Sequence, residues 1–353
     1  MSTSLRNPKD SMKSTWNQQD RGQWTTAHWM LKLLGLDSPS SDKDKSTPVH
    51  EKSDKVPYAP ELQFHIWVLI HALVPLSIHY AYIAYFGRNM SAFGAFFFYS
   101  FAFKAIAIHQ LHVLRRLGNV YGFFDGDKHE RDGVPDIGVR KVVNSLLSVA
   151  TFRPMMTVFV AYQINEGPTT INWLWLPLTI GIYGLILDFW FYWYHRIMHD
   201  TDSLWQYHRT HHLTKHPNPL LTIYADSVQE VFDIVGIPMM AYISMKLVGF
   251  PFSFYDWWIS QQYVVFTEIL GHSGLRMEAT SVSTLNWLWR FLDAELVIED
   301  HDLHHRKGWR KSHNYGKQTR VWDRLFGTCH PRIEGHKDNI DYVNTRRVLQ
   351  SPG

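Results

Sequence analysis

The sequence predicts an all-α, polytopic membrane protein with four to six transmembrane helices and a helical, histidine-rich cap on the cytosolic side. Three observations predict this class. Long apolar runs follow one another along the chain, basic residues gather at one set of their ends, and histidines cluster just beyond those ends. A helix of about 20 apolar residues crosses the hydrocarbon core of a bilayer. A soluble domain does not place this many apolar runs of such length in succession.

The composition excludes several other classes of protein. Of 353 residues, 21 are histidine and only one, Cys329, is cysteine. A single cysteine rules out an internal disulfide, a thiolate zinc cluster and an iron–sulfur centre. The net charge of +3 is too small to indicate a nucleic-acid partner. The basic residues lie beside the apolar runs, which is typical of a protein at a membrane surface.

Residues 1–57 are polar and rich in Ser, Asp, Lys and Gln, so we expect a disordered tail. Residues 29–36 form a short apolar island within it, which we expect to lie on a membrane surface. No basic stretch leads directly into an apolar core and a small-residue cleavage site, so no signal peptide is expected. The membrane domain is therefore predicted to occupy residues 58–353.

Two apolar runs after this tail predict a helical hairpin. Residues 62–86 and 92–114 are each long enough to cross a bilayer, and residues 87–91 break the apolar pattern between them. The second run contains Lys104. We interpret this lysine as a polar group in the helix interior or one that snorkels to the interface.

Four more apolar segments follow. Residues 142–162 are mostly apolar but contain Arg153-Pro154, which predicts either a kinked span or a re-entrant segment. Residues 173–194 predict a strong span. Residues 231–248 and 255–270 predict a shorter pair. We expect an even number of spans, four or six, with both termini on the same side of the membrane.

Basic residues set the predicted orientation. Lys52 and Lys55 precede the first run and Arg115-Arg116 follows the second, whereas the hairpin between them has only Arg88. Cytosolic loops carry an excess of Lys and Arg, so the N-terminus and the loop after the second run are predicted to be cytosolic. Following the remaining spans places every histidine cluster on the cytosolic side. The polar, basic residues 275–353 would form a cap over them.

Nine histidines form a candidate metal site. Residues three and four apart share one face of a helix, so H-x-x-x-H and H-x-x-H-H each aim imidazoles at a common point. These spacings occur in HRIMH, HRTHH and HDLHH, and a ninth histidine lies in GHSG. Nine ligands are about twice what one ion accepts, so two metal ions are implied. The candidates are His195, His199, His208, His211, His212, His272, His301, His304 and His305.

The histidines and the spans together favour one kind of chemistry. Neutral imidazole suits iron, zinc and copper. Two irons would activate dioxygen, whereas two zincs would indicate hydrolysis. A lipid oxidant needs membrane spans because its substrate lies in the bilayer. Asp188 precedes His195 by seven residues, so it is expected either to accept a hydrogen bond from a ligand imidazole or to bond to a neighbouring helix.

The motifs HRIMH, HRTHH, GHSG and HDLHH, followed by NYG and WDRLFGT, resemble the membrane fatty acid hydroxylase and sterol desaturase superfamily. The resemblance covers residues 173–328. It implies a helical membrane fold, usually of the endoplasmic reticulum, with a histidine-ligated di-iron centre that uses dioxygen. It also implies electron delivery by a b5-type cytochrome and its reductase. Two departures occur: residue 276 is arginine where certain hydroxylases have another histidine, and residues 224–226 lack the His-Pro pair of several sterol-oxidising members.

The leading interpretation is an oxygen-dependent membrane hydroxylase with two irons, or zinc as their substitute, acting on a fatty acyl chain. One alternative is a sterol or isoprenoid desaturase or C-methyl oxidase. Another is a non-catalytic membrane protein that binds or transports metal. A transporter would need ionisable residues along its spans, whereas these histidines gather on one side. The sequence does not separate hydroxylation from desaturation, because both begin with hydrogen abstraction from an unactivated C–H bond.

Overall fold

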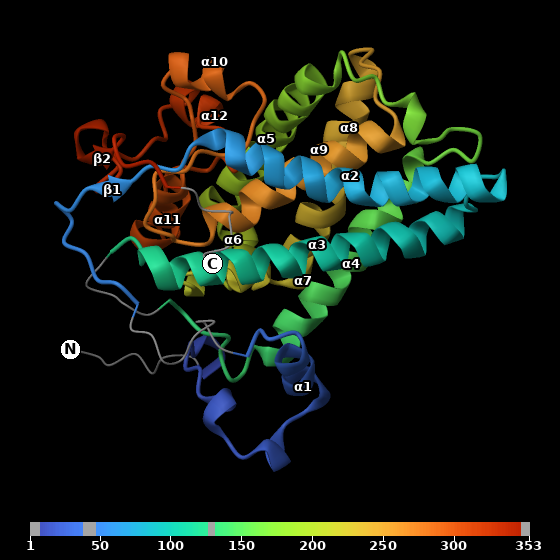
Figure 1. The fold of residues 1–353 in the computed structure, drawn as a ribbon. Helices are drawn as coiled ribbons and strands as arrows, with labels where there is room; N and C mark the ends of the chain where they lie inside the picture. The colour runs from blue at the N-terminus through green and yellow to red at the C-terminus, as the bar shows by residue number, and fades with distance from the viewer. Residues whose placement is uncertain (1–7, 38–46, 126–130, 347–353) are drawn as a thin grey trace.

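The computed structural model describes residues 8–37, 47–125 and 131–346, which fold into a helical bundle with a cap at one end (Figure 1). The predicted all-α class is confirmed. Within the described residues, β1 (Val56–Pro57) and β2 (Ile340–Asp341) form a single parallel pair. The α-helices are α1 (Thr26–Leu33), α2 (Glu61–Phe86), α3 (Ala92–Tyr121), α4 (Val139–Ala161), α5 (Leu176–Asp200), α6 (Asp202–His208), α7 (Ser227–Val231), α8 (Ile237–Leu247), α9 (Phe254–Gly271), α10 (Asn286–Phe291), α11 (Ile298–Lys307) and α12 (Val321–Leu325). Shorter helical turns are η1 (Pro8–Asp10), η2 (Trp16–Gln18), η3 (Arg21–Gln23), η4 (Pro168–Thr170), η5 (His211–Leu213), η6 (Pro219–Ile223), the π-helical η7 (Phe232–Gly236) and η8 (Lys337–Asn339).

The predicted hairpin consists of α2 and α3, two long helices that meet at the turn between them and diverge from there, with α9 packed against both (Figure 1). Gly87 ends α2 at φ 63°, a left-handed conformation that glycine adopts without strain. The Ser91 hydroxyl caps α3 by accepting a hydrogen bond from the Gly94 amide at 3.2 Å. Every fourth side chain of α2 from Leu62 to Ile78 is apolar and at least half exposed. This stripe is the surface expected to face lipid.

In the part of the chain that the structure describes, five segments are long and apolar enough to cross a membrane: α2, α3, α4, α5 and the continuous stretch Ser227–Leu247. This number lies within the predicted range of four to six. Residues 142–162 do not form a re-entrant loop, because α4 runs through Arg153 and Pro154 as one helix.

The segment predicted as a last span, residues 255–270, is helical but is not among these five. It forms α9, which is buried along almost its whole length and contacts α2, α3, α4, α5 and α11. Polar residues such as Gln261 and Glu268 lower its apolar character, and neighbouring helices surround it instead of lipid. The even number of crossings therefore depends on α9 and remains a prediction.

The prediction of a disordered N-terminal tail is wrong for residues 8–37 and 47–57, while residues 1–7 and 38–46 lie outside the described part. Trp16 is buried, and its indole N–H donates to the Val134 carbonyl at 3.1 Å. The Asp136 carboxylate accepts from the Trp16 amide at 2.7 Å. Leu31 is fully buried where α1 packs on α4. Average polarity missed this fold because a few large apolar side chains anchor an otherwise polar segment.

Candidate metal centre

All nine predicted histidines meet where the cap joins the bundle. His195 and His199 lie on the last turns of α5, and His272 directly follows α9. The remaining two clusters lie on the α6–η5 segment and on α11. Each of the nine is at most 5% exposed, so all are buried within the protein. The helical repeat brings His195 and His199 to one face of α5, as predicted. The prediction that each H-x-x-H-H aims its imidazoles at one common point is wrong, because α6 ends at His208 and η5 begins at His211, and both clusters divide their imidazoles between two groups.

The nine imidazoles form two groups. In each group the ligand atoms lie within 4.8 Å of one another. The first group comprises His195, His199, His208, His212 and His304. The second group comprises His211, His272, His301 and His305. His211 and His212 are adjacent in the chain but belong to different groups, so the two groups lie next to each other.

The Nδ1 atoms of seven histidines face an oxygen acceptor, which fixes the tautomer. The His195 Nδ1 lies 2.8 Å from the Tyr315 carbonyl and the His208 Nδ1 lies 3.0 Å from the Gln229 side-chain oxygen. A neutral imidazole that donates from Nδ1 presents a lone pair at Nε2. The other acceptors are the carbonyls of Arg310 for His199, Tyr224 for His211, Glu268 for His272, His313 for His304 and Thr214 for His305.

The Nε2 atoms face one another at distances that suit a bound cation. They are 3.0 Å apart in His195 and His208, and 3.1 Å apart in His211 and His272. In both pairs each Nδ1 already faces an acceptor, so two lone pairs meet and repel unless a cation lies between them. Two ligands at right angles, each about 2.1 Å from one ion, would be about 3.0 Å apart. The residues therefore fit two imidazole-ligated metal ions.

Burial keeps the imidazoles outside the membrane spans neutral. Desolvation lowers the pKa of His211 to about 3, with the nearby Lys317 ammonium adding to the effect. The pKa values of His208, His304 and His305 are held well below the ordinary value by desolvation and by neighbouring histidines. Only neutral imidazole binds a metal. The site is thus in its binding-competent protonation state across neutral pH.

Asp188 does not contact a ligand imidazole, so the first expectation for it is wrong. Its carboxylate accepts from the backbone amides of Lys317, Gln318 and Thr319 at 2.6, 2.8 and 3.1 Å, and from the Thr319 hydroxyl at 2.7 Å. These residues follow Tyr315, whose carbonyl accepts from His195. Asp188 therefore fixes the loop that orients His195. The spacing of seven residues predicted that Asp188 and His195 share one face of α5, but it did not reveal residues 317–319 as the partners of Asp188.

The NYG and WDRLFGT motifs build the same loop. The Asp323 carboxylate accepts from the amides of Tyr315 and Gly316 at 2.8 and 2.7 Å. Desolvation raises the pKa of Asp323 to about 6. Residue 316 must be glycine, because a Cβ there would lie 2.3 Å from the Thr319 carbonyl oxygen. Asn314 has φ 51° and donates to the Asp300 carbonyl at 2.8 Å, which ties the loop to α11.

Buried ion pairs hold α11 behind the histidines. Asp302, within HDLHH, pairs with Arg131 and Arg306, each at 2.5 Å. Burial would raise the pKa of Asp302, but these two charges outweigh it and the pKa lies below the ordinary value. Arg276 is not a substitute ligand, because it pairs with Glu334 at 2.8 Å. The sequence alone did not point to these pairings.

Gln229 contacts a candidate ligand histidine, and the sequence did not point to it. Its amide oxygen faces His208 at 3.0 Å, and its amide nitrogen donates to Asp233 at 3.2 Å. The available signal was a polar residue just before an apolar run, next to the π-helical turn η7. Such turns are frequent at functional sites.

A sequence model of the fatty acid hydroxylase family matches residues 180–328, which include all nine histidines. Fatty acid hydroxylase vlmA from a Lecanicillium species is 39% identical over 326 residues, which is 88% of this chain and 88% of that protein. The chain belongs to the fatty acid hydroxylase family. No solved structure matches it significantly.

More distant relatives place this hydroxylase in the wider sterol desaturase superfamily, as its motifs predicted. Alkylglycerol monooxygenase from Xenopus tropicalis is 26% identical over 206 residues, covering 57% of this chain but only 39% of that protein. Methylsterol monooxygenase 2-2 from Arabidopsis thaliana is 29% identical over 212 residues, covering 58% of this chain and 71% of that protein. The chain is therefore an oxidoreductase of the hydroxylase and monooxygenase class.

Proposed function

We propose that this protein hydroxylates a fatty acyl chain within the membrane, using dioxygen and two iron ions held by the nine histidines. The observation that supports this most is the pair of adjacent, buried imidazole groups with opposed Nε2 lone pairs. Bound iron would supply dioxygen activation and the oxidation of a C–H bond. Zinc would replace iron when the protein is overexpressed, because imidazole sites bind zinc at least as well.

The overall reaction balances as a monooxygenation. One C–H bond of the acyl chain becomes C–OH, and dioxygen, two electrons and two protons also yield one water. The chain's own residues keep the imidazoles neutral and oriented through their carbonyl acceptors. Burial of all nine histidines excludes bulk water from the reacting centre, which limits side reactions of the oxidant.

The acyl substrate is favoured by the relatives. The fatty acid hydroxylase matches at 39% identity over most of this chain, whereas the methylsterol monooxygenase matches at 29% over 58% of it. Oxidation of a sterol or another isoprenoid is the second candidate, and its support is that more distant similarity.

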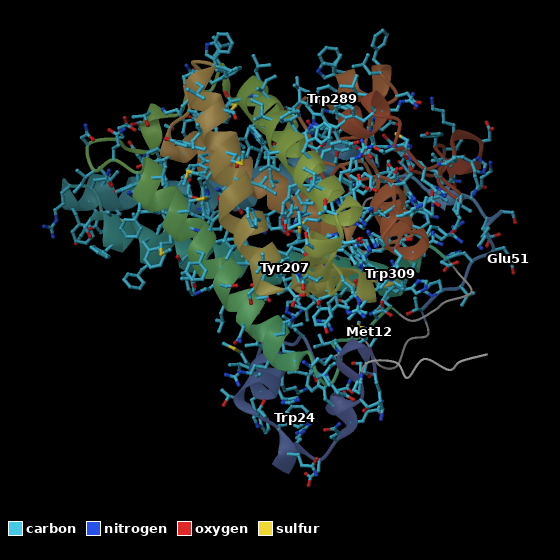
Figure 2. All side chains as sticks on the ribbon, turned by 180° about the vertical axis from the view of Figure 1, so that it is seen from behind. Met12, Trp24, Glu51, Tyr207, Trp289 and Trp309 are labelled. Atoms are coloured by element: carbon cyan, nitrogen blue, oxygen red, sulfur yellow. The ribbon has the colours of Figure 1, made fainter. Side chains whose placement is uncertain are left out.

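Electrons would enter through an aromatic path from the surface. Trp309 is 39% exposed and lies beside α11 (Figure 2). Its ring is 5.2 Å from Trp205, whose ring is 5.1 Å from His199. We therefore propose that a b5-type cytochrome, reduced by its reductase, docks over Trp309.

Exposed basic residues surround this docking position. Lys307 and Lys311 are exposed, and the Lys215 ammonium lies 4.8 Å from the Trp309 ring centre. A positive surface of this kind steers an acidic partner. Arg306, which directly follows HDLHH in the sequence, does not belong to this surface, because its side chain is 3% exposed and pairs with Asp302 and Asp125.

We propose an endoplasmic reticulum location with the histidines facing the cytosol. The charge asymmetry around the first hairpin supports this orientation. Glycosylation acceptors inserted at residues 87–91 should be modified in microsomes, and acceptors near His212 should not. Modification near His212 would show that the histidines face the lumen, which would contradict the proposed orientation.

The activity is tested with microsomes, a reduced electron donor, isotopically labelled dioxygen and a panel of acyl and sterol substrates. One labelled oxygen atom in an acyl product is the expected result. A new double bond without label, or conversion of sterols alone, would favour the second candidate. Elemental analysis of active protein should find two metal ions per chain, and one ion or none would contradict the proposed centre.

A further inference from the structure

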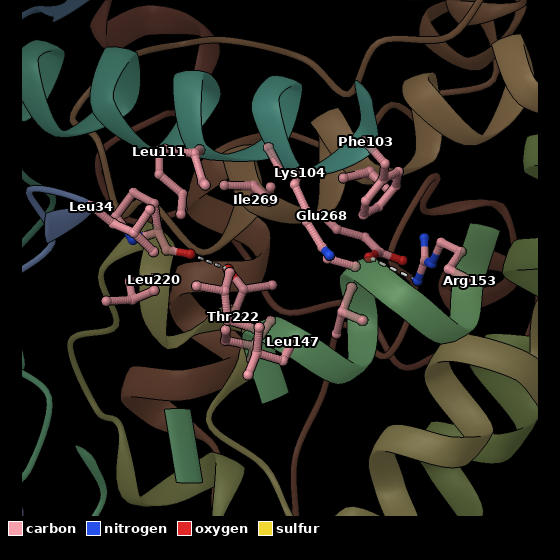
Figure 3. Close-up of a pocket in the computed structure, with 18 of the residues that line it drawn as sticks. Leu34, Phe103, Lys104, Leu111, Leu147, Arg153, Leu220, Thr222, Glu268 and Ile269 are labelled. Carbon is pink, nitrogen blue, oxygen red and sulfur yellow. Dashed lines mark hydrogen bonds and ion pairs between the residues drawn. The ribbon is translucent and has the colours of Figure 1, made fainter. Parts of the chain in front are cut away.

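A cavity of about 180 Å³ lies between α3, α4, α9 and η6, and Leu34 after α1 closes one end of it (Figure 3). One face of α3 lines it from Phe103 to Leu111, a length of about 12 Å along the helix. Nearly all of its wall is apolar. An engineered apolar cavity of roughly 150 Å³ holds benzene, so this one accommodates about six carbons of a lipid chain.

The cavity adjoins the second histidine group. Glu268 lines it, and the Glu268 backbone carbonyl accepts from His272 Nδ1 at 2.7 Å. Ile223 also lines it, and the next residue, Tyr224, provides the carbonyl that faces His211. A molecule in this cavity therefore lies one layer of residues away from the candidate metal ligands.

Two cations extend into this apolar space. Lys104 reaches from the middle of α3 into the cavity towards Glu268 and Arg153, and not towards the end of its helix (Figure 3). Arg153 is 3% exposed, and its Nε has no hydrogen-bond partner among the described residues. Its Nη2 is 3.7 Å from Glu268, an ion pair longer than a hydrogen bond. An ionisable group within a membrane span indicates a functional site.

The charges around the cavity leave one positive charge in excess. Glu268 is shared between Arg153 and Lys317, the latter at 3.4 Å. Among the described residues no carboxylate lies within ion-pair distance of the Lys104 ammonium. The cavity lining itself holds two cations, Lys104 and Arg153, and one carboxylate, Glu268, which leaves one positive charge in excess. A single negative charge on a ligand would balance the set.

We propose that this cavity binds the carboxylate end of a free long-chain fatty acid, with Lys104 as its ion-pair partner and the Arg153 Nε as a hydrogen-bond donor. This rests on the proposed function and names its substrate class: the free acid, and not an ester, thioester or amide of it. Anchoring the carboxylate next to the metal centre fixes which carbon reaches the oxidant. The hydroxyl should therefore keep its position counted from the carboxyl carbon when the chain is lengthened.

The test uses the full-length, metal-loaded protein in lipid nanodiscs with its electron donor. It compares a saturated sixteen-carbon acid with its methyl ester in the wild type, Lys104→Met and Lys104→Arg. Lys104→Met should raise KM for the acid at least about tenfold and leave KM for the ester unchanged, because only the acid loses an ion pair. Lys104→Arg should retain acid turnover. The matched control is Arg116→Met, which removes an exposed cation from the same helix and should leave KM unchanged for both substrates.

Equal losses for acid and ester in Lys104→Met, or no loss for either, would overturn the carboxylate site while leaving hydroxylation intact. A hydroxyl position that follows the methyl end as the chain lengthens would also overturn it. Equilibrium binding of radiolabelled acid gives a readout independent of turnover. Binding that is weakened in Lys104→Met and kept in Lys104→Arg, in a protein that oxygenates neither substrate, would support the carboxylate site and refute the proposed function.

Discussion

Replacing Asp188 with asparagine tests whether a carboxylate that is not itself a candidate ligand sets the metal affinity of the first histidine group. Asp188 accepts four hydrogen bonds from residues 317–319, and these residues follow the Tyr315 carbonyl that orients His195. Asparagine has nearly the same shape as aspartate but replaces one acceptor oxygen with an NH₂ donor. The substitution therefore changes hydrogen bonding and charge without creating a cavity.

The structure sets the size of the effect. An asparagine oxygen can still accept from the amides of Lys317 and Gln318, which share one carboxylate oxygen of Asp188. Its NH₂ group would then face the Thr319 amide, which donates to the other oxygen at 3.1 Å. Two donors would meet in a buried site, at a cost of about 1–3 kcal/mol. Displacing the support of a ligand histidine typically lowers metal affinity about 10–100-fold.

The assay is metal titration of the purified apoprotein, together with thermal stability in detergent. Asp188→Asn should weaken the binding of one metal ion about 10–100-fold and leave the other much less affected, because the second histidine group does not use this loop. Asp256→Asn is the matched control, since Asp256 caps α9 away from the histidines. Asp256→Asn should lose stability without a change in metal affinity. Unchanged binding of both ions in Asp188→Asn would refute the reasoning.

Three further predictions address other parts of the site. Gln229→Leu should lower the affinity of the first histidine group about 10–100-fold in metal titration, because His208 loses its acceptor, while Gln229→Glu keeps an acceptor and should lose less. Trp309→Ala should slow the reduction of the metal centre by the cytochrome but not by dithionite, measured by stopped-flow absorbance. Trp287 is also exposed, and Trp287→Ala should slow neither reduction. An equal loss of rate with both reductants in Trp309→Ala would contradict the proposed electron path. Burial raises the pKa of Glu278 from 4.5 to about 8, because the buried site favours the neutral carboxyl over the carboxylate. The stability that depends on the neutral carboxyl is therefore complete below about pH 4.5 and is lost as pH rises through about 8. Glu278→Gln should therefore raise the thermal midpoint in detergent more at about pH 9, where the buried carboxyl is ionised in the wild type, than at about pH 4. The opposite order would show that burial does not penalise the ionised carboxyl.

The parts of the molecule that depend on local sequence were predictable. The apolar run at residues 62–86 became α2 because a helix satisfies its own backbone hydrogen bonds. The spacing of His301, His304 and His305 put three imidazoles on one side of α11 because the helical repeat does so wherever the helix lies. The nine candidate ligands were therefore accessible from the sequence, although their division between two groups was not.

The tertiary structure decided what depends on partners distant in the chain. Nothing within residues 208–212 shows that His211 joins His272 while His212 joins His304. Asp188 lies 129 residues before the first amide that it binds, Lys317. Trp16 is buried and its indole N–H donates to the Val134 carbonyl, 118 residues away in the chain, so the polar composition of residues 1–57 wrongly predicted disorder. The sequence by itself determined the helices and the candidate ligands on or beside each one, because those follow from hydrogen bonds and side-chain directions within a few residues. Only the packing of α5, α9 and α11 against one another decided which ligands meet, because those contacts depend on the shape and burial of whole helices.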